Sequence, residues 1–300
     1  MISRIYCGDN LEVLRTLPAG SVNTCITSPP YWGQRSTGIE GELGIEQTPG
    51  DYVKNLVEVF REVRRVLRDD GTLWIILGDS YAADRGGSAM PAETLAGGQS
   101  GRGEGSALRG RGKEKCPRRN CKAYGMKHKD LIGIPWRVAF ALQDDGWTLR
   151  NEIIWQKPIC VPESVTDRCT RSHETIFLFS KSGRYYFDHE GIKEPAVNPG
   201  ETRSRRTVWK VPTKPFKGGK HFSSYPPDLI RPCVLAGSPL NGTVLDPFFG
   251  AGTTGLVALE EGRQYIGIEL NPEFIEIADK RLSGLRLAQS INEGQMGVIA

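Results

Sequence analysis

This 300-residue chain has no long hydrophobic run. Its apolar stretches, such as residues 73–77, are far shorter than the roughly 20 residues that span a bilayer. The first residues, Met1-Ile2-Ser3-Arg4, lead into a strand-like segment rather than a signal sequence. We therefore expect a cytoplasmic protein that does not associate with membranes.

The cysteine pattern excludes a secreted disulfide framework. The seven cysteines are odd in number and irregularly spaced, at positions 7, 25, 116, 121, 160, 169 and 233. Cys116, Cys121 and His128 suggest a zinc site only weakly, because the gap between the cysteines is wide and no second cysteine pair follows. We expect reduced thiols and no metal.

The glycine pattern that binds a pyrophosphate is also missing. Residues 243–245 are strand-like, and residues 246–254 read Asp-Pro-Phe-Phe-Gly-Ala-Gly-Thr-Thr before a helical pattern begins at Gly255. Asp246-Pro247-Phe248 stands where glycines would receive a phosphate. A second strand, residues 264–269, ends in Glu269, and a carboxylate at that place accepts hydrogen bonds from ribose. The pattern favours a ligand with ribose but no phosphate.

The remaining periodicity is that of one large α/β domain, for which 300 residues at 38% apolar content suffice. Strands alternate with amphipathic helices, and Pro135 falls in the first turn of one helix. The strands are expected at residues 3–6, 22–27, 73–77, 147–155, 174–180, 243–245 and 264–269, with 147–155 and 174–180 as a hairpin-like pair. The helices are expected at 10–17, 51–67, 134–142, 228–235, 255–261 and 272–285. The region 84–127 has no periodicity and reads as a long insertion.

Positive charge is concentrated in two stretches. Residues 84–129 hold eleven Lys or Arg against four acids, a net charge of +7, and residues 200–220 carry +6. The chain as a whole is only +4, so the remainder is at −9. This distribution is typical of a surface that follows phosphates, although each stretch alone also suits a solvated loop.

A second motif, Ser28-Pro29-Pro30-Tyr31, follows the strand at 22–27. With the 246–254 turn, it resembles the motifs of the amino-group DNA methyltransferases, which modify an exocyclic nitrogen of cytosine or adenine. The resemblance covers most of the chain. The motif order, with the serine loop more than two hundred residues before the turn, is similar to the circularly permuted beta class of that family. It implies a Rossmann-like, mostly parallel sheet with helices on both faces and S-adenosyl-L-methionine as cofactor.

The resemblance also implies residue roles. Glu269 would bind ribose, Asp9 would lie near adenine, and the 221–226 segment would close over the methionine end. The cofactor set is Asp9, Asp246, Pro247, Phe248, Gly250, Gly252, Thr253, Glu269, Phe222 and Ser223. Asp9 equally suits a helix N-cap, and Asp79, which follows the strand at 73–77, equally suits a turn.

The serine loop, Ser28, Pro29, Pro30 and Tyr31, is the predicted catalytic segment. An exocyclic amine is a poor nucleophile because its lone pair is delocalised into the ring. The Ser28 oxygen and the Pro29 carbonyl would accept hydrogen bonds from its two N–H groups. The two prolines stiffen the loop and so hold these acceptors in place. Tyr31 would stack on a base flipped out of the duplex.

We expect the catalytic half of the domain at 1–83, the basic insertion at 84–129, a return to the core at 130–159, a target-recognition region at 160–220 and the cofactor half at 221–300. Double-stranded DNA is the expected partner, with a homodimer and a cognate restriction endonuclease as further partners. The predicted DNA contacts are Arg168, Arg171, Arg203, Arg205, Arg206, Arg118 and Arg119. The stretch 168–174 equally suits a structural corner.

Several alternatives stay open. Ser at the first motif position favours cytosine N4 as the target, with adenine N6 as the alternative. An RNA or protein amide methyltransferase would use a similar loop and turn, and a DNA-binding module without catalysis would have lost one of the two motifs. Pro232-Cys233 resembles the nucleophile of carbon-methylating enzymes, but it lies in an apolar helical stretch before the turn, which favours a core cysteine.

Overall fold

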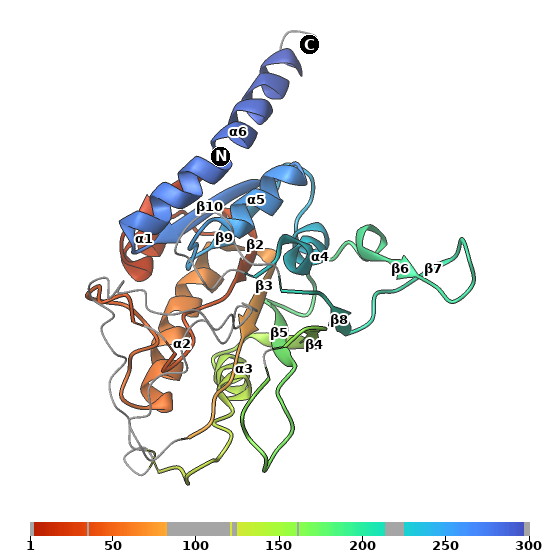
Figure 1. The fold of residues 1–300 in the computed structure, drawn as a ribbon. Coiled ribbons are helices and arrows are strands. Elements are labelled where there is room, and N and C mark those ends of the chain that lie inside the picture. Colours follow the sequence, from red (N-terminus) through yellow and green to blue (C-terminus); the bar gives the residue numbers. More distant parts are fainter. Residues whose placement is uncertain are drawn as a thin grey trace, which may run out of the picture.

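A computed structural model describes residues 3–34, 36–82, 121, 125–160, 162–213 and 225–296, with side chains up to residue 286. The centre of the molecule is an eight-stranded sheet (Figure 1). Its strands are β1 (Arg4–Cys7), β2 (Val22–Thr27), β3 (Leu67–Leu77), β4 (Thr148–Gln156), β5 (His173–Ser180), β8 (Val208–Lys210), β9 (Thr243–Asp246) and β10 (Gln264–Glu269). They are arranged in the order β1-β10-β9-β2-β3-β5-β4-β8.

The direction of the strands decides which loops meet. Neighbours from β1 to β3 pair in parallel, as do β4 and β8, whereas β5 pairs antiparallel with both β3 and β4. The carboxyl ends of seven strands and the amino end of β5 therefore lie at one edge, which we call the carboxyl edge. The mostly parallel α/β sheet that the sequence predicted is confirmed.

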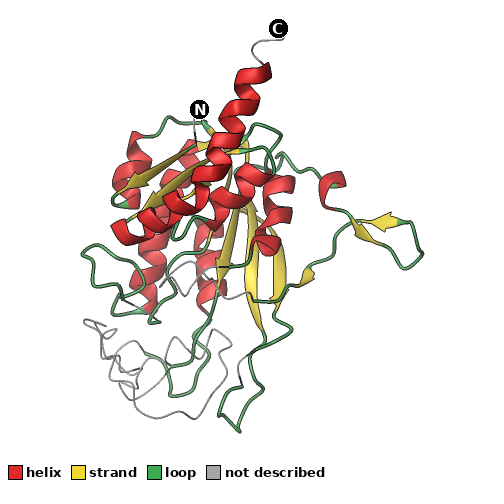
Figure 2. Cartoon of the chain, turned by 45° about the horizontal axis from the view of Figure 1, so that its top comes forward, coloured by secondary structure: helices red, strands yellow, loops and turns green. Residues whose placement is uncertain are grey.

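Helices cover both faces of the sheet (Figure 2). One face packs against α1 (Asn10–Thr16), α2 (Pro49–Val66) and α3 (Ile134–Asp144), and the other against α4 (Pro227–Gly237), α5 (Thr253–Glu260) and α6 (Pro272–Met296). Strand β3 supplies both cores, because Leu73 and Ile75 join the first while Trp74 and Ile76 join the second. This alternation is the period of two that a buried strand requires.

Two predicted boundaries differ from the structure by more than two residues. Strand β3 begins at Leu67 rather than residue 73, because Gly71 lies inside the strand, where a Cβ would come within 3.0 Å of the Arg68 carbonyl oxygen. Helix α6 continues to Met296 instead of ending near Gly284. A single glycine inside a helix costs only about 1 kcal/mol and does not end it.

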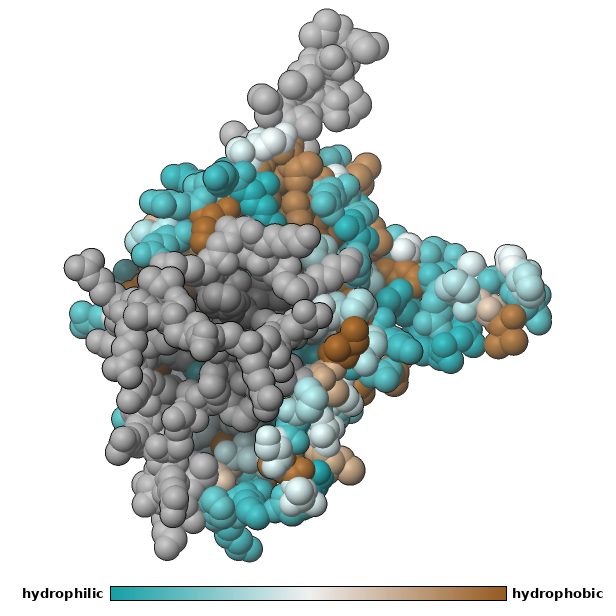
Figure 3. All heavy atoms as spheres, viewed as in Figure 1, coloured by the Kyte–Doolittle hydropathy of each residue, from teal (hydrophilic) through white to brown (hydrophobic). Residues whose placement is uncertain are grey.

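A small projection leaves the body beside β8. It contains the short 3₁₀ helix η3 (Glu190–Ile192) and the two-stranded sheet of β6 (Glu194–Pro195) and β7 (Thr202–Arg203). We call residues 194–206 the arm; it extends away from the sheet in Figures 1 and 2, and its visible surface is mainly hydrophilic (Figure 3). Val197, between the two strands, is 87% exposed.

Two expectations concern the chain as a whole. Within the described ranges, no helix has both the length and the apolar character needed to cross a membrane. The division of the chain into segments stays a prediction. Strands β5 and β8, which lie in the 160–220 region, are part of the main sheet. Most of the basic insertion lies outside the described residues.

Candidate active site

The centre of the carboxyl edge is a topological switch point between β9 and β2. From β9 the chain crosses through α5 to β10 on one side, and from β2 it crosses through α2 to β3 on the other. Ligands of open α/β sheets bind where neighbouring crossovers diverge in this way. Asp9 and Ser28 follow β1 and β2 at this edge, whereas Asp246 and Glu269 are the last residues of β9 and β10.

Asp246 joins the serine loop to the predicted cofactor turn. Its carboxylate is 1% exposed and accepts a hydrogen bond from the Thr27 hydroxyl at 2.6 Å, one residue before Ser28. The Phe248 amide donates to the same oxygen at 3.0 Å, and the hydroxyls of Tyr225 and Thr254 donate to the other. Burial raises the pKa of Asp246, while these four donors oppose the rise. Asp246 is thus a buried connection, and its predicted ligand contact stays a prediction.

Glu269 and the two glycines form the other wall of the turn. Gly250 and Gly252 have φ values of 51° and 76°, a left-handed backbone that suits glycine. The Gly250 amide donates to one Glu269 carboxylate oxygen at 2.7 Å, and the Asn271 amide donates to the other at 2.8 Å. Burial raises the pKa of Glu269. Because a carboxylate has about four acceptor positions, Glu269 can also accept hydrogen bonds from a ribose.

Arg281 connects the turn to helix α6. This α6 residue donates to the Ala251 carbonyl at 3.1 Å and to the Thr253 hydroxyl at 2.9 Å, and burial lowers its pKa. Sequence reasoning missed Arg281, because it is not part of a recognisable motif. Tyr225 lies in the 221–226 segment that the resemblance singled out, but it was not among the predicted site residues. Thr253 is 4% exposed and begins α5, so its predicted role as a cofactor ligand also stays a prediction.

The serine loop is held by hydrogen bonds to α2 and to the loop before it. The hydroxyl of buried Tyr52 donates to the Pro30 carbonyl at 2.9 Å, and the Trp32 indole donates to the Glu46 carbonyl at 2.9 Å. Pro29 is buried, whereas Ser28 is only partly buried. The loop therefore presents Ser28 from a fixed backbone.

Tyr31 connects this loop to β5. Its hydroxyl donates to the Glu174 carboxylate at 2.7 Å, and Lys157 donates to the other oxygen of that carboxylate. Its ring lies against Gly78, where a Cβ would be 2.5 Å from the Tyr31 Cε2 atom. Burial and the Glu174 charge raise the pKa of Tyr31, against a smaller lowering by the Ser28 side chain. Sequence reasoning missed Glu174 and Lys157, because strand pairing alone brings them here.

Asp9 and Asp79 both cap helices. Asp9 accepts the Glu12 amide at 3.0 Å at the start of α1, and Asp79 accepts the Gly133 and Ile134 amides at 3.0 and 3.1 Å at the start of α3. Asp9 therefore has the helix N-cap role that the sequence also allowed. Its proximity to adenine stays a prediction, which the capping role does not contradict because a second carboxylate oxygen is present.

The arginines predicted to contact DNA make local interactions in the structure. Arg168 pairs with Glu163, and its Cζ atom lies 3.8 Å from the centre of the Tyr81 ring. The Cζ atom of Arg205 lies 4.7 Å from the centre of the Trp209 ring. Arg203 and Arg206 both pair with Glu194 in the arm, and Arg171 donates to the His173 carbonyl. Their contacts to DNA stay predictions. Arg118, Arg119, Phe222 and Ser223 lie outside the described residues.

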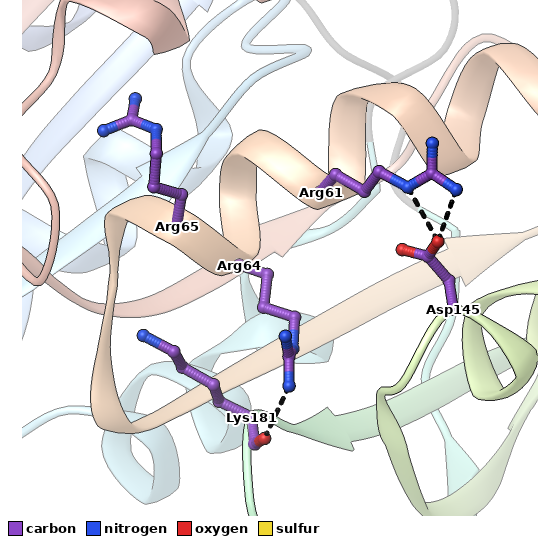
Figure 4. Close-up of a pocket in the computed structure, with 5 residues that line it drawn as sticks. All are labelled: Arg61, Arg64, Arg65, Asp145 and Lys181. Carbon is purple, nitrogen blue, oxygen red and sulfur yellow. Dashed lines mark hydrogen bonds and ion pairs between the residues drawn. The ribbon is translucent and has the colours of Figure 1, made fainter.

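A basic cavity of about 360 Å³ lies at the opposite edge of the sheet (Figure 4). Its charges already serve the fold, since Arg61 pairs with Asp145 and Arg65 donates to the carbonyls of Leu14 and Leu17, where α1 ends. Lys181 donates to the Leu67 carbonyl. This cavity is thus explained by the packing of the fold and is not part of the candidate active site at the carboxyl edge.

Cys233 is a core residue, as expected. It is completely buried in α4, and burial raises the pKa of its thiol, which disfavours the reactive thiolate. Across the described residues, no group of three or more His, Cys, Asp or Glu side chains is arranged to hold a metal ion.

The structure thus brings Glu269 and the Ser-Pro-Pro-Tyr loop to one switch point, the arrangement expected of an α/β enzyme with a nucleoside-like cofactor. A family model described as DNA methylase matches residues 22–280. The chain belongs to this family, the amino-group (N4/N6) DNA methyltransferases, and its motif-based prediction is confirmed.

Curated relatives agree with this assignment. The type II methyltransferase M.XycI of Xanthomonas campestris pv. cyanopsidis is 50% identical over 287 residues, which cover 94% of this chain and 88% of the relative. M.SmaI of Serratia marcescens is 49% identical over 280 residues, covering 93% and 90% of the two chains.

Solved structures share the fold. PvuII DNA methyltransferase, named as cytosine-N4-specific, has a TM-score of 0.65 at 18% identity and covers 96% of this chain and 93% of its own. A putative DNA modification methylase of Thermus thermophilus, solved with S-adenosyl-L-methionine, has a TM-score of 0.60 at 24% identity, with 95% and 96% covered.

Proposed function

We propose that this protein transfers a methyl group from S-adenosyl-L-methionine to the exocyclic N4 amine of a flipped cytosine in double-stranded DNA. The observation that carries the proposal is the 2.6 Å hydrogen bond between Thr27 and Asp246. It holds the serine loop against the predicted cofactor turn, so the amine and the methyl donor can meet at one edge.

The residues at the switch point fit this cofactor. Glu269 has acceptor capacity left for ribose hydroxyls, whereas the Phe248 and Gly250 amides of the turn already donate to Asp246 and Glu269 instead of being directed at a phosphate. The carboxylates of Asp9, Asp246 and Glu269 make the edge negative, which suits a sulfonium cation better than a phosphate. When bound, S-adenosyl-L-methionine supplies a methyl group activated by positively charged sulfur.

The chain's own contribution is alignment and exclusion of water. The Ser28 oxygen and the Pro29 carbonyl accept hydrogen bonds from the two N–H groups of the amine. This draws the nitrogen lone pair out of the ring and toward the methyl donor. Tyr31 offers its ring to the extruded base. Tyr52 and Trp32 hold the loop, so this geometry exists before the base arrives.

Cytosine is the preferred target because Ser rather than Asp or Asn stands first in the loop. Adenine N6 is the alternative, and its amine would meet the same two acceptors. A methyltransferase for RNA or for a protein amide is the second candidate class. The basic stretches and the arm favour a DNA duplex, to which Arg203 and Arg206 would contribute after exchanging Glu194 for phosphates.

The partners follow from the family. The relatives are named type II methyltransferases, so we propose that this protein works beside a cognate restriction endonuclease. A homodimer is a separate part of the proposal, because a chain of 300 residues covers only a short stretch of DNA. A cytoplasmic location is part of the same proposal.

The deciding experiment incubates the purified protein with labelled S-adenosyl-L-methionine and DNA from a methylation-deficient bacterial strain, with RNA and protein extract in parallel. Mass spectrometry of the digested nucleosides should find N4-methylcytosine in the DNA. N6-methyladenine would overturn the base assignment, and label confined to RNA or protein would overturn the DNA substrate.

A further inference from the structure

The Tyr31 hydroxyl is held by an ion pair that no sequence motif contains. Glu174 stands at the amino end of β5, the one strand that runs against the others, so it reaches the carboxyl edge by direction alone. Lys157 follows β4, whose Trp155 pairs with Glu174 in the register of the two strands. Glu174 accepts hydrogen bonds from Tyr31 at 2.7 Å and from Lys157.

This ion pair is largely removed from water. The side chains of Lys157 and Glu174 are 19% and 15% exposed, and the Lys157 ammonium lies 4.5 Å from the centre of the Trp155 ring. A partly buried pair is screened less than a surface pair, so its field acts on neighbouring groups. The neighbouring group that receives this field most directly is the Tyr31 hydroxyl, which donates to Glu174.

Tyr31 is therefore fixed at both ends. Gly78 leaves room for the ring, and any larger residue there would place a Cβ 2.5 Å from it. At the other end, the hydroxyl donates to a carboxylate, which shifts electron density from the O–H bond toward the ring. An electron-rich aromatic face attracts positive charge more strongly than an ordinary phenol.

We propose that Glu174 is a positioning residue that acts through Tyr31, orienting its ring and increasing its attraction for the positive charge that develops on the methylated amine. The inference rests on the proposed function. In the reaction, the bond from sulfur to methyl breaks as the bond from methyl to nitrogen forms, and the sulfur keeps the electron pair. The nitrogen becomes positively charged until it releases one proton to solvent.

A double-mutant cycle tests this proposal. Glu174→Gln keeps an acceptor but removes the charge, and Tyr31→Phe removes the connection. The assay is single-turnover methyl transfer to DNA from a methylation-deficient bacterial strain, together with the Kd for S-adenosyl-L-methionine. Each single variant should lose about tenfold in transfer rate, with the cofactor Kd unchanged. In the Tyr31→Phe background, Glu174→Gln should have little further effect.

Asp145→Asn is the matched control. Asp145 is also ion-paired and only 13% exposed, but it lies at the opposite edge, so this variant should transfer at the wild-type rate. Equal losses from Glu174→Gln with and without the Tyr31 hydroxyl would overturn the proposal, as would a wild-type rate in Glu174→Gln. If Glu174→Gln does not fold, Tyr31→Phe decides alone, because a full rate without the hydroxyl contradicts the proposal. A wild-type protein that leaves DNA unmethylated contradicts the proposed function instead.

Discussion

At the residue scale, one hydrogen bond joins two parts of the chain that are 219 residues apart. Thr27 ends the strand before Ser28, and Asp246 ends the strand before the cofactor turn. Parallel pairing of β2 with β9, which matches Cys25 to Leu245, sets these two residues side by side. The catalytic and cofactor motifs are thus combined by strand register.

Thr27→Val tests this connection because valine keeps the shape and loses the hydroxyl. Asp246 would keep its burial with one donor fewer, so the free energy of unfolding should fall by about 1 to 3 kcal/mol. Methyl transfer should fall as well, because the serine loop loses its tie to the turn. Chemical denaturation and single-turnover kinetics measure the two effects. Thr27→Ser, which restores the hydroxyl, should recover most of both; a Val variant as active as the wild type would show that the connection is dispensable.

Glu269 predicts a pH dependence of cofactor binding. Burial raises its pKa, so the carboxylate is protonated at a higher pH than an ordinary glutamate. As the pH falls into the mildly acidic range, Glu269 loses its charge and part of its acceptor capacity, and the affinity for S-adenosyl-L-methionine should decrease.

Calorimetric titration between about pH 5 and pH 8 measures this dependence. Glu269→Gln should bind more weakly at pH 8 and lose most of the acid-dependent change. If the wild type and Glu269→Gln show the same pH profile, Glu269 is not the titrating group. Glu12→Gln, an exposed carboxylate in the first turn of α1, is the control and should keep the wild-type profile.

At the scale of elements, the parts that were predictable are those with strong local patterns. Strands β2 and β10 were predicted with the observed bounds, because each is a short apolar run between turn residues. The hairpin-like pairing of β4 with β5 is confirmed, but the pairing of β5 with β3, which brings Glu174 to the site, was not predictable, because no local pattern connects these two strands. Arg281 was missed for a similar reason, because only the packing of α6 against α5 brings it to the turn.

The arm is the element with the clearest predicted role in DNA binding. Its strands pair with each other rather than with the main sheet, so the double variant Arg203→Ala, Arg206→Ala, which removes two predicted DNA contacts from the arm, should leave the core intact. The KM for DNA should rise about tenfold, as expected when 1 to 2 kcal/mol of contacts are lost, while cofactor affinity stays constant.

Steady-state methylation at varied DNA concentrations measures this effect. Arg61→Ala removes another ion-paired arginine, one at the opposite edge whose side chain is 60% exposed, and should leave the KM unchanged. An arm variant with the wild-type KM would place target recognition elsewhere.

At the scale of the whole molecule, the sheet explains why two distant motifs form one site. In the order β10-β9-β2-β3, the crossover from β9 leads to one side and the crossover from β2 leads to the other. A crevice for a ligand is expected between them, at the carboxyl ends of β9 and β2. The fold class and motif pairing were readable from the sequence, because both motifs follow strands. The assignment of individual arginines to DNA was not, since ion pairs such as Arg203 with Glu194 depend on the folded arm.

The most direct test of the account is Ser28→Ala, measured for cofactor affinity and for single-turnover transfer to DNA. Removing one acceptor from the amine should lower the transfer rate about a hundredfold, as for other preorganised polar groups in active sites. The Kd for S-adenosyl-L-methionine should stay within about twofold of the wild-type value, which is less than about 0.5 kcal/mol. Transfer at the wild-type rate by Ser28→Ala would contradict the account.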